Sequence, residues 1–516
     1  MHALLFLLFL AQEKPASLLP GTGIWKHPIA TRNPDAQRFF DQGLNEMYGF
    51  NRYEALRSFK KAAELDPSAA MPQWGIAAAS GPYINMDGEP TYDMKVSCAA
   101  VDAGLKLATA PRERAYLDAA KSRCPDYAHP DAYIAAARAL AERWPDDLDA
   151  QTFYAESLLI PTRWHWYTND GKPAEGVADA ERALEQILRR WPDHPGANHL
   201  YIHAVESSPT PERAVPSAQR LMGITPSEGH MVHMPGHIWL VLGEWELAAS
   251  VNDRAAEVDR EYFATTGVTD GPYPMYYAHN LDFIRYARSM QGRKADALKA
   301  SDTLSAAVAP MAEAMPEMAD IFTLIPKLTL LRFQQWDAVL QLPKPKDIQK
   351  VSATMWHYMR SLAFAAKNDK PAAALERADF EAARKQIPDA ADWGQNKTKD
   401  VLAMASEILA AKSGDEVAHL RRAVELQDAF VYDEPPAWYY PVRESLGAAL
   451  LRAHQPAEAE RVFREGARRS PKNGRMLFGL LESLKAQNKT EEATWVQKEY
   501  EAAWSKADVQ LKLEDM

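Results

Sequence analysis

The sequence predicts an all-α fold, a solenoid of about ten or eleven helix pairs. Small residues, an aromatic residue and a proline recur at fixed spacing along the chain, which is typical of helical repeats. No segment has the alternating apolar and polar pattern of a sheet domain. With 47% hydrophobic and 25% charged residues, the composition is that of a folded globular chain.

The first clear repeat covers residues 43–67, GLNEMYGFNRYEALRSFKKAAELDP. Gly43 and Ala55 are small enough for two helices to approach closely, an aromatic residue follows at Phe59, and Pro67 cannot continue the second helix. The same landmarks predict further repeats at 195–228, 229–262, 440–473 and 474–507 and one starting at 278, with weaker helix pairs over 70–194, 319–388 and 389–430.

This helix–turn–helix pattern resembles that of tetratricopeptide repeats over nearly the whole chain. A bacterial subgroup of such proteins is similar in the stretches WGIAAASGPYIN, ERAYLDAA, HPGANHLYIHAVESS, GHMVHMPGHI and EPPAWYYPVRESLG. The resemblance implies a right-handed superhelix in which repeat positions 2, 5, 9, 12 and 13 of each first helix face a concave groove. The resemblance implies a fold but does not indicate a reaction.

Four segments rich in Gly, Pro and aromatic residues interrupt the repeat period. We expect them to be loops that cap or line a pocket, or that brace irregular stacking of the helices. They are residues 81–92, 161–174, 263–277 and 431–441.

The landmarks divide the chain into consecutive segments. The expected segments are 1–16, a signal peptide; 17–194, repeats with insertions; 195–311, histidine-rich repeats; 312–430, central helix pairs; and 431–516, C-terminal repeats. The apolar run at 3–11 fits the core of a signal peptide but follows no Lys or Arg, so an apolar first helix is the alternative. We expect export to the periplasm or beyond the cell, and otherwise a cytoplasmic location. If the protein is exported, Cys98 and Cys124 can form one disulfide.

Several function classes are disfavoured by the sequence. The net charge is −11 and no long basic run occurs, so we expect no nucleic-acid partner. No stretch after the first residues is long and apolar enough to span a bilayer. No Gly-rich phosphate loop and no G-x-S-x-G elbow is present, which disfavours nucleotide chemistry and serine hydrolysis. The oligomeric state is left open.

The strongest functional signal is a cluster of histidines on predicted groove positions. His199 and His203 take repeat positions 5 and 9, and Glu206 takes position 12 of the same helix, a spacing that places all three on one stripe. In the next repeat, groove positions 2, 5 and 9 are His230, His233 and His237, and in the one after, positions 2 and 5 are His279 and Asp282.

This pattern predicts a transition-metal site. Histidines four residues apart have Cβ atoms about 5–6 Å apart, so His199 and His203 can chelate one ion, and His233 and His237 repeat that geometry. Glu206 adds a carboxylate as ligand, bridge or catalytic base, and His230 and His279 are additional ligands. Pro235 and Gly236 interrupt or bend the second of these helices.

The donor set narrows the metal. Imidazoles with one or two carboxylates and no thiolate suit Zn, Cu, Fe or Ni and disfavour Mg and Ca. Six imidazoles are enough for two ions with three ligands each, or for one ion. Two alternatives to a metal site remain. One is a metal-free polar groove that binds an acidic peptide, and the other is that the histidines only pack against neighbouring side chains.

Other polar and aromatic residues are candidates for the same site. Glu156, counted from Pro145, takes groove position 9 and is a further ligand or base. The loop residues Trp164, His165 and Trp166, and the group Tyr432, Asp433, Glu434, Trp438, Tyr439 and Arg443, are expected to bind substrate or to fill the interior. The turn histidines His129, His194, His419 and His454 are expected at the surface.

These observations favour a metalloprotein, an enzyme that carries out metal-dependent oxidation or hydrolysis on a small molecule or peptide in the groove. The alternative is a scaffold whose groove binds a peptide or a partner protein without catalysis.

Overall fold

The computed structural model describes residues 14–86, 92–268 and 273–516. The apolar run at 3–11, and parts of the expected loops 81–92 and 263–277, lie outside the described residues. The chain divides into two compact units, each described by itself below. Unit 1 takes Met1–Trp166, Pro173–Pro235 and Asp253–Tyr277, and unit 2 takes Tyr167–Lys172, Gly236–Asn252 and Ala278–Met516.

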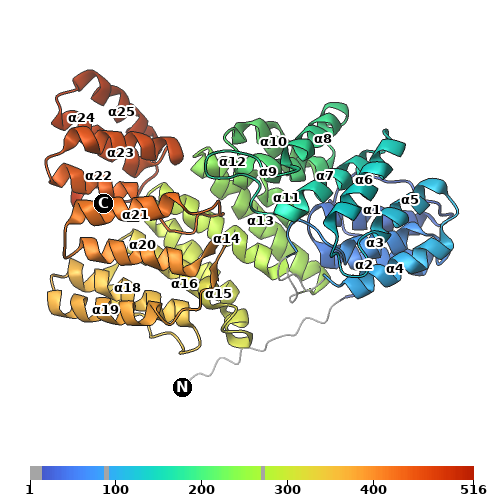
Figure 1. The fold of residues 1–516 in the computed structure, drawn as a ribbon, viewed down its shortest axis with the longest axis horizontal. Coiled ribbons are helices and arrows are strands. Elements are labelled where there is room, and N and C mark those ends of the chain that lie inside the picture. The colour runs from blue at the N-terminus through green and yellow to red at the C-terminus, as the bar shows by residue number, and fades with distance from the viewer. Residues whose placement is uncertain (1–13, 87–91, 269–272) are drawn as a thin grey trace. The chain divides into compact units, whose positions relative to one another are not determined.

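Unit 1 is built from short antiparallel helices (Figure 1). They are α1 Pro34–Tyr48, α2 Arg52–Leu65, α3 Met71–Ala79, α4 Met94–Leu107, α5 Pro111–Lys121, α6 Pro130–Arg143, α7 Leu148–Leu159, η1 Ile160–Thr162, α8 Val177–Arg190, α9 Pro195–Glu206, η2 Pro211–Ala214, α10 Val215–Ile224 and α11 Gly229–His233. Many begin at a proline, whose missing N–H costs nothing in the first turn. Asn33 caps α1 by accepting hydrogen bonds from the backbone of Asp35 and Ala36.

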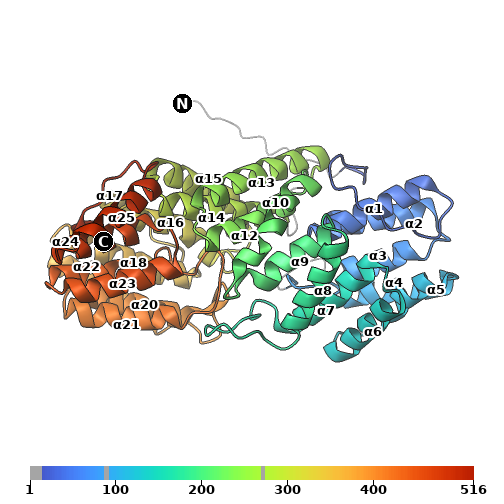
Figure 2. The same cartoon turned by 90° about the horizontal axis from the view of Figure 1, so that it is seen from above.

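Helix α12, Pro235–Val241, lies in unit 2 except for its first residue. Helices α13, Trp245–Thr266, and α14, Tyr273–Met290, each contribute residues to both units. The rest of unit 2 also consists of paired helices (Figure 2). They are α15 Lys294–Ala314, α16 Asp320–Arg332, α17 Trp336–Gln341, α18 Lys350–Ala366, α19 Lys370–Arg384, α20 Thr398–Ala411, α21 Glu416–Asp428, α22 Arg443–Arg452, α23 Pro456–Arg469, α24 Gly474–Ala486, α25 Thr490–Ala503 and η3 Leu513–Asp515.

The only described strands are β1 Asp392–Trp393 and β2 Asn396–Lys397, which form a two-residue antiparallel hairpin. The fold is therefore all-α, as expected, and each unit is a stack of helix pairs. None of the described helices combines the length and the apolar character needed to cross a bilayer.

The small and aromatic residues that recur in the predicted repeats lie where paired helices contact each other. A Cβ added to Gly43 in α1 would lie 2.8 Å from the ring of Phe59 in α2, and one added to Gly75 in α3 would meet the same ring. In unit 2, the ring of Phe463 is enclosed in the same way by Gly447 and Gly479. The spacing of small and aromatic residues thus sets the distance between paired helices.

Two predicted segments differ in detail. The helix expected from residue 229 is divided, because α11 ends at His233 and α12 starts at Pro235, as the position of this proline indicated. The prediction of a loop over 263–277 is wrong at both ends. Residues up to Thr266 continue α13, and α14 already begins at Tyr273, because Pro274 falls in its first turn, where proline is tolerated.

Cys98 in α4 and Cys124, which follows α5, form a disulfide with their Cα atoms 5.7 Å apart. The bond joins two consecutive helices of unit 1.

Gly43→Ala should lower the melting temperature measured by circular dichroism. The new methyl group overpacks the contact with Phe59, at a cost of about 1–3 kcal/mol. Gly223→Ala is the matched control, because nothing lies within 4 Å of the Cβ position there. It should be neutral or stabilise α10 by up to about 1 kcal/mol. Equal effects of the two substitutions would contradict the packing role of Gly43.

Candidate metal centre

Three histidines of unit 1 come together in its interior. His199 and His203 lie one turn apart on α9, and His230 comes from α11. Ring centroids are 5.0 Å apart for His199 and His203, 5.0 Å for His199 and His230, and 6.4 Å for His203 and His230. Each residue offers a ring nitrogen, and these three atoms lie within 4.8 Å of one another. The structure therefore places side by side three residues that the repeat positions selected.

Hydrogen bonds fix the orientation of two of these rings. The Nδ1 atom of His199 donates to the backbone carbonyl of Tyr48, and the Nδ1 atom of His203 lies 2.9 Å from Oε1 of Glu206. A carbonyl or an ionised carboxylate can only accept, so the proton of each neutral ring is on Nδ1. Nε2 is then the nitrogen with a lone pair, which is the form in which histidine binds metals.

The cluster is buried rather than open to a groove. His199 is 0% exposed, His203 1% and His230 3%, and Glu206 is 2% exposed. This corrects the expectation that these positions line an open concave face. The reason is that the loop between α1 and α2 covers them. The Phe50 ring lies 4.3 Å from His199, 5.9 Å from His203 and 5.3 Å from His230, measured between centroids.

Other aromatic residues of unit 1 complete the surroundings. Trp164 and Trp166, from the loop predicted at 161–174, each lie 5.8 Å from the His203 ring, and Tyr276 lies 4.6 Å from the His230 ring. Trp166 is also a core residue, because its indole donates to the Leu159 carbonyl. His233 stacks on His230 with centroids 5.4 Å apart.

Unit 2 holds its own smaller group of predicted residues. The Nδ1 atom of His237 lies 2.5 Å from Oε2 of Glu434, which also accepts a hydrogen bond of 3.1 Å from the Tyr432 hydroxyl. His279 is half-buried, with its ring 6.2 Å from that of His237. Glu434, in the loop predicted at 431–441, therefore contacts the predicted ligand His237.

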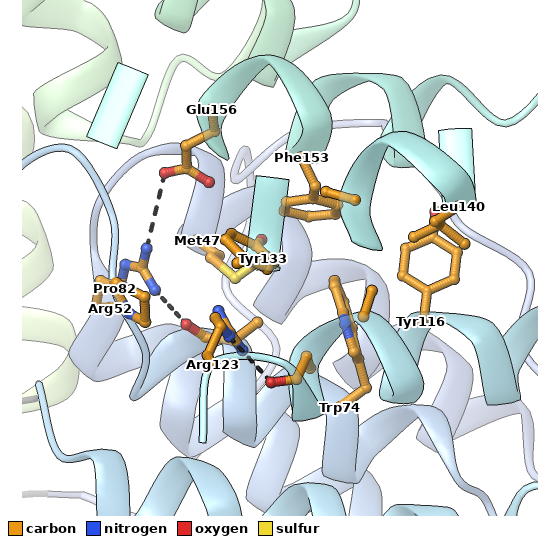
Figure 3. Close-up of a pocket in the computed structure, with 14 residues that line it drawn as sticks. Met47, Arg52, Trp74, Pro82, Tyr116, Arg123, Tyr133, Leu140, Phe153 and Glu156 are labelled. Atoms are coloured by element: carbon orange, nitrogen blue, oxygen red, sulfur yellow. Dashed lines mark hydrogen bonds and ion pairs between the residues drawn. The ribbon is translucent and has the colours of Figure 1, made fainter. Parts of the chain in front are cut away.

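Several of the predicted site residues lie outside these two groups of histidines. Glu156 is paired with Arg52, with the closest nitrogen and oxygen 4.0 Å apart, and lines a cavity of about 20 Å³ in unit 1 (Figure 3). Burial raises the pKa of Glu156, although Arg52 and Arg123 oppose the rise. Asp282 accepts a hydrogen bond from Arg285 on its own helix. His165 is exposed to solvent.

Three residues of the predicted group between Tyr432 and Arg443 pack in the interior of unit 2. Trp438 is 1% exposed and packs against Tyr358, and Tyr439 is a buried neighbour of Trp438. Arg443 forms a two-pronged ion pair with Asp428. These contacts place all three in the packing of the unit rather than beside the histidines.

A second buried polar network supports α9. Asp149 lies 2.7 Å from Nδ1 of His27 and 3.4 Å from Nε2 of His194, and it accepts hydrogen bonds from the Tyr48 hydroxyl and the Trp25 indole. Burial disfavours the charge of Asp149, but the contacts with His194 and His27 outweigh burial and hold the pKa of its carboxyl far below the usual range.

This network corrects the expectation that His194 lies at the surface. His194 is 0% exposed because its Nδ1 caps α9 by accepting from the backbone N–H of Ala197, while its other nitrogen faces Asp149. Tyr48 joins the network to the imidazole cluster, since its hydroxyl binds Asp149 and its carbonyl binds His199. Sequence reasoning missed Tyr48, Phe50 and Asp149, which are distant from the histidines along the chain.

The chain resembles tetratricopeptide-repeat proteins in its helix pairs and in the small and aromatic residues between them. No protein-family model and no curated protein matches the sequence. Among solved structures, the human IFIT1 dimer with m7Gppp-AAAA has 13% identity, with 93% of this chain and 92% of that chain covered and a TM-score of 0.36.

The Cut9–Hcn1 hetero-tetramer of APC/C has 12% identity, coverage of 95% and 77%, and a TM-score of 0.31. Yeast Tom70 has 11% identity, coverage of 90% of each chain and a TM-score of 0.29.

Asp149→Asn should destabilise unit 1 by about 3–5 kcal/mol at pH 7, because it leaves buried donors without a charged acceptor. Since folding lowers the pKa of Asp149, its stabilisation is complete above the unfolded pKa, near 4, and declines as the pH falls below it. The difference in melting temperature from wild type should therefore shrink between pH 5 and pH 3. Asp170→Asn, at an exposed position, is the control and should change little. A constant difference at every pH would contradict this role.

Proposed function

We propose that the protein is a metalloprotein whose core ligands are His199, His203 and His230. The observation that carries this proposal is that one ring nitrogen from each of these three histidines lies within 4.8 Å of the other two, while Nδ1 hydrogen bonds to the Tyr48 carbonyl and the Glu206 carboxylate orient the rings of His199 and His203. Bound metals are typically held by imidazoles whose second nitrogen donates in this way.

The donor set fits a transition metal. Buried imidazoles suit Zn, Cu or Fe, and the clustered nitrogens lie within 4.8 Å of one another, compared with the spacing of about 3.3 Å that tetrahedral Zn–N bonds require. We propose one or two ions. In unit 1 His233 is a further ligand, and in unit 2 His237 and His279 are further ligands, with Glu434 as the carboxylate that orients His237.

Such an ion would supply Lewis-acid or redox chemistry for hydrolysis or oxidation. The protein's own residues supply orientation and exclusion of water. Glu206 holds the proton of His203 on Nδ1, and it can act as a general base only after leaving that hydrogen bond. Phe50, Trp164 and Tyr276 form apolar walls suited to an organic substrate, a small molecule or a peptide.

We also propose that the protein is exported. The Cys98–Cys124 disulfide supports this, because such bonds persist in oxidising compartments and are rare in the cytosol.

Metal analysis tests the function. Protein purified without a histidine tag should contain Zn, Cu or Fe by plasma mass spectrometry, and His199→Ala combined with His203→Ala should reduce the occupancy nearly to zero. Because both imidazoles are buried and hydrogen-bonded, their removal should also lower the melting temperature below that of the metal-free parent, so circular dichroism is needed to check that the variant is folded.

His357→Ala is the matched control, because His357 is paired with Glu376 in unit 2, outside the imidazole cluster. It should retain the metal. If the double variant keeps full metal occupancy, or if metal-free wild-type protein takes up none of Zn, Cu or Fe, the proposal of a metal site is wrong. The protein would then be a scaffold that binds a peptide or a partner protein without catalysis.

Glu206→Gln gives a finer test. The neutral amide preserves the shape of the side chain but weakens its hold on the His203 proton, so metal affinity should fall about 10–100-fold while the fold is preserved. Competition with a chelator measures the change. An unchanged affinity would show that Glu206 does not orient a ligand.

A further inference from the structure

The small cavity drawn in Figure 3 lies in unit 1 and has a volume of about 20 Å³. Residues of α1, α2, α3, α5, α6 and α7 line it, and Trp74, Tyr133 and Phe153 are among its aromatic walls. No histidine is among the described residues of the lining. Because about 10–15 Å³ is enough to hold one water molecule, the cavity has room for one small particle, a water molecule or a monatomic ion.

The described lining of this cavity carries more positive than negative charge. Its charged side chains are those of Arg52, Arg123 and Glu156. Arg52 is 3% exposed and Arg123 is 4% exposed, so both guanidinium groups are held away from bulk water. The positive excess is one charge when Glu156 is ionised and two charges when it is protonated.

Glu156 is too far from Arg52 to form a hydrogen bond with it. The closest nitrogen and oxygen atoms are 4.0 Å apart, whereas an N–H···O hydrogen bond spans about 2.7–3.2 Å. Arg52 instead donates to the Ala78 carbonyl and lies over the Tyr83 ring, with the guanidinium carbon 3.7 Å from the ring centroid. The Nε atom of Arg52 has no hydrogen-bond partner among the described residues.

Arg123 forms hydrogen bonds only with neutral groups among the described residues. It donates to the carbonyls of Ala120 and Ala77, at 3.4 and 3.3 Å, and its guanidinium carbon lies 5.1 Å from the centroid of the Tyr133 ring. Glu156 attracts it electrostatically without forming an ion pair. Because a buried ion is costly unless an opposite charge accompanies it, Arg123 is the group of this cavity that most requires an anion.

The C-terminus of α3 supplies part of the missing negative charge. Ala77 and Ala78, whose carbonyls accept from the two arginines, belong to the last turn of this helix. A helix C-terminus is equivalent to about half an elementary negative charge. Together with an ionised Glu156 it still does not balance two guanidinium groups, and with a protonated Glu156 the excess is larger.

We propose that this cavity binds one chloride ion between Arg52 and Arg123. The N–H groups of the two arginines would donate to the ion, and such hydrogen bonds are strong because both partners are charged. The small volume suits a monatomic anion better than a phosphate or a carboxylate. The site is independent of the proposed metal centre.

The melting temperature of metal-free wild-type protein should rise as sodium chloride replaces sodium gluconate at constant ionic strength. An ion that binds only the folded state stabilises it by RT ln(1 + [L]/Kd), so the rise should follow the chloride concentration. Arg123→Gln should abolish the chloride-dependent rise. The variant with His199→Ala and His203→Ala should keep it, which separates this site from the metal centre.

Arg138→Gln is the matched control for Arg123→Gln. Arg138 also lies near a tyrosine ring, 5.5 Å from the centroid of Tyr154, but it is not part of the described lining, so this variant should keep the full rise. Glu156→Gln should strengthen chloride binding by about tenfold, because it removes a negative charge close to the ion.

Equal melting temperatures of the wild type in chloride and gluconate overturn the proposal. A rise that persists in Arg123→Gln, a rise that is lost in Arg138→Gln, or weaker chloride binding by Glu156→Gln also overturns it. In crystals soaked in sodium bromide, an anomalous scattering peak should lie between Arg52 and Arg123. A cavity without that peak holds water alone, and the proposal is then wrong. If Arg123→Gln does not fold, the bromide peak decides.

Discussion

The close approach of paired helices around an aromatic ring is the constraint on which the structure depends. The Phe59 ring lies against the Cβ positions of Gly43 and Gly75, and the Phe463 ring lies in the same way between Gly447 and Gly479. Such contacts leave no space for side chains between the helices at these points. The larger side chains of each helix must therefore project to other faces, and one of these faces in α9 carries His199, His203 and Glu206.

Burial of that face decides the chemistry of its side chains. Away from water, a polar group is stable only with a hydrogen-bond partner, and here the partners come from distant parts of unit 1. Tyr48 serves both networks, because its carbonyl orients His199 and its hydroxyl binds Asp149. The position of α9 and the orientation of its first imidazole thus depend on one residue at the end of α1.

The sequence predicted what depends on local spacing. Glycine, alanine and proline landmarks predict helix pairs because their effects on packing and termination act within one repeat, and His199 and His203 face the same way because they are four residues apart. It did not predict Phe50, Asp149 or the burial of His194, since these depend on contacts between residues far apart in the chain. Glu156 shows a similar limit. The repeat frame placed it on a groove position but did not predict the ion pair that it forms with Arg52.

The proposed metal centre follows from the hydrogen bonds that orient its rings. In the imidazole cluster, the Tyr48 carbonyl and the Glu206 carboxylate hold the Nδ1 protons of His199 and His203, and three ring nitrogens within 4.8 Å of one another form a donor set suited to a cation. Because a hydrogen bond at the second ring nitrogen fixes the tautomer and the orientation of a ligating histidine, the distant residues that hold these rings belong to the proposed site as much as the imidazoles do.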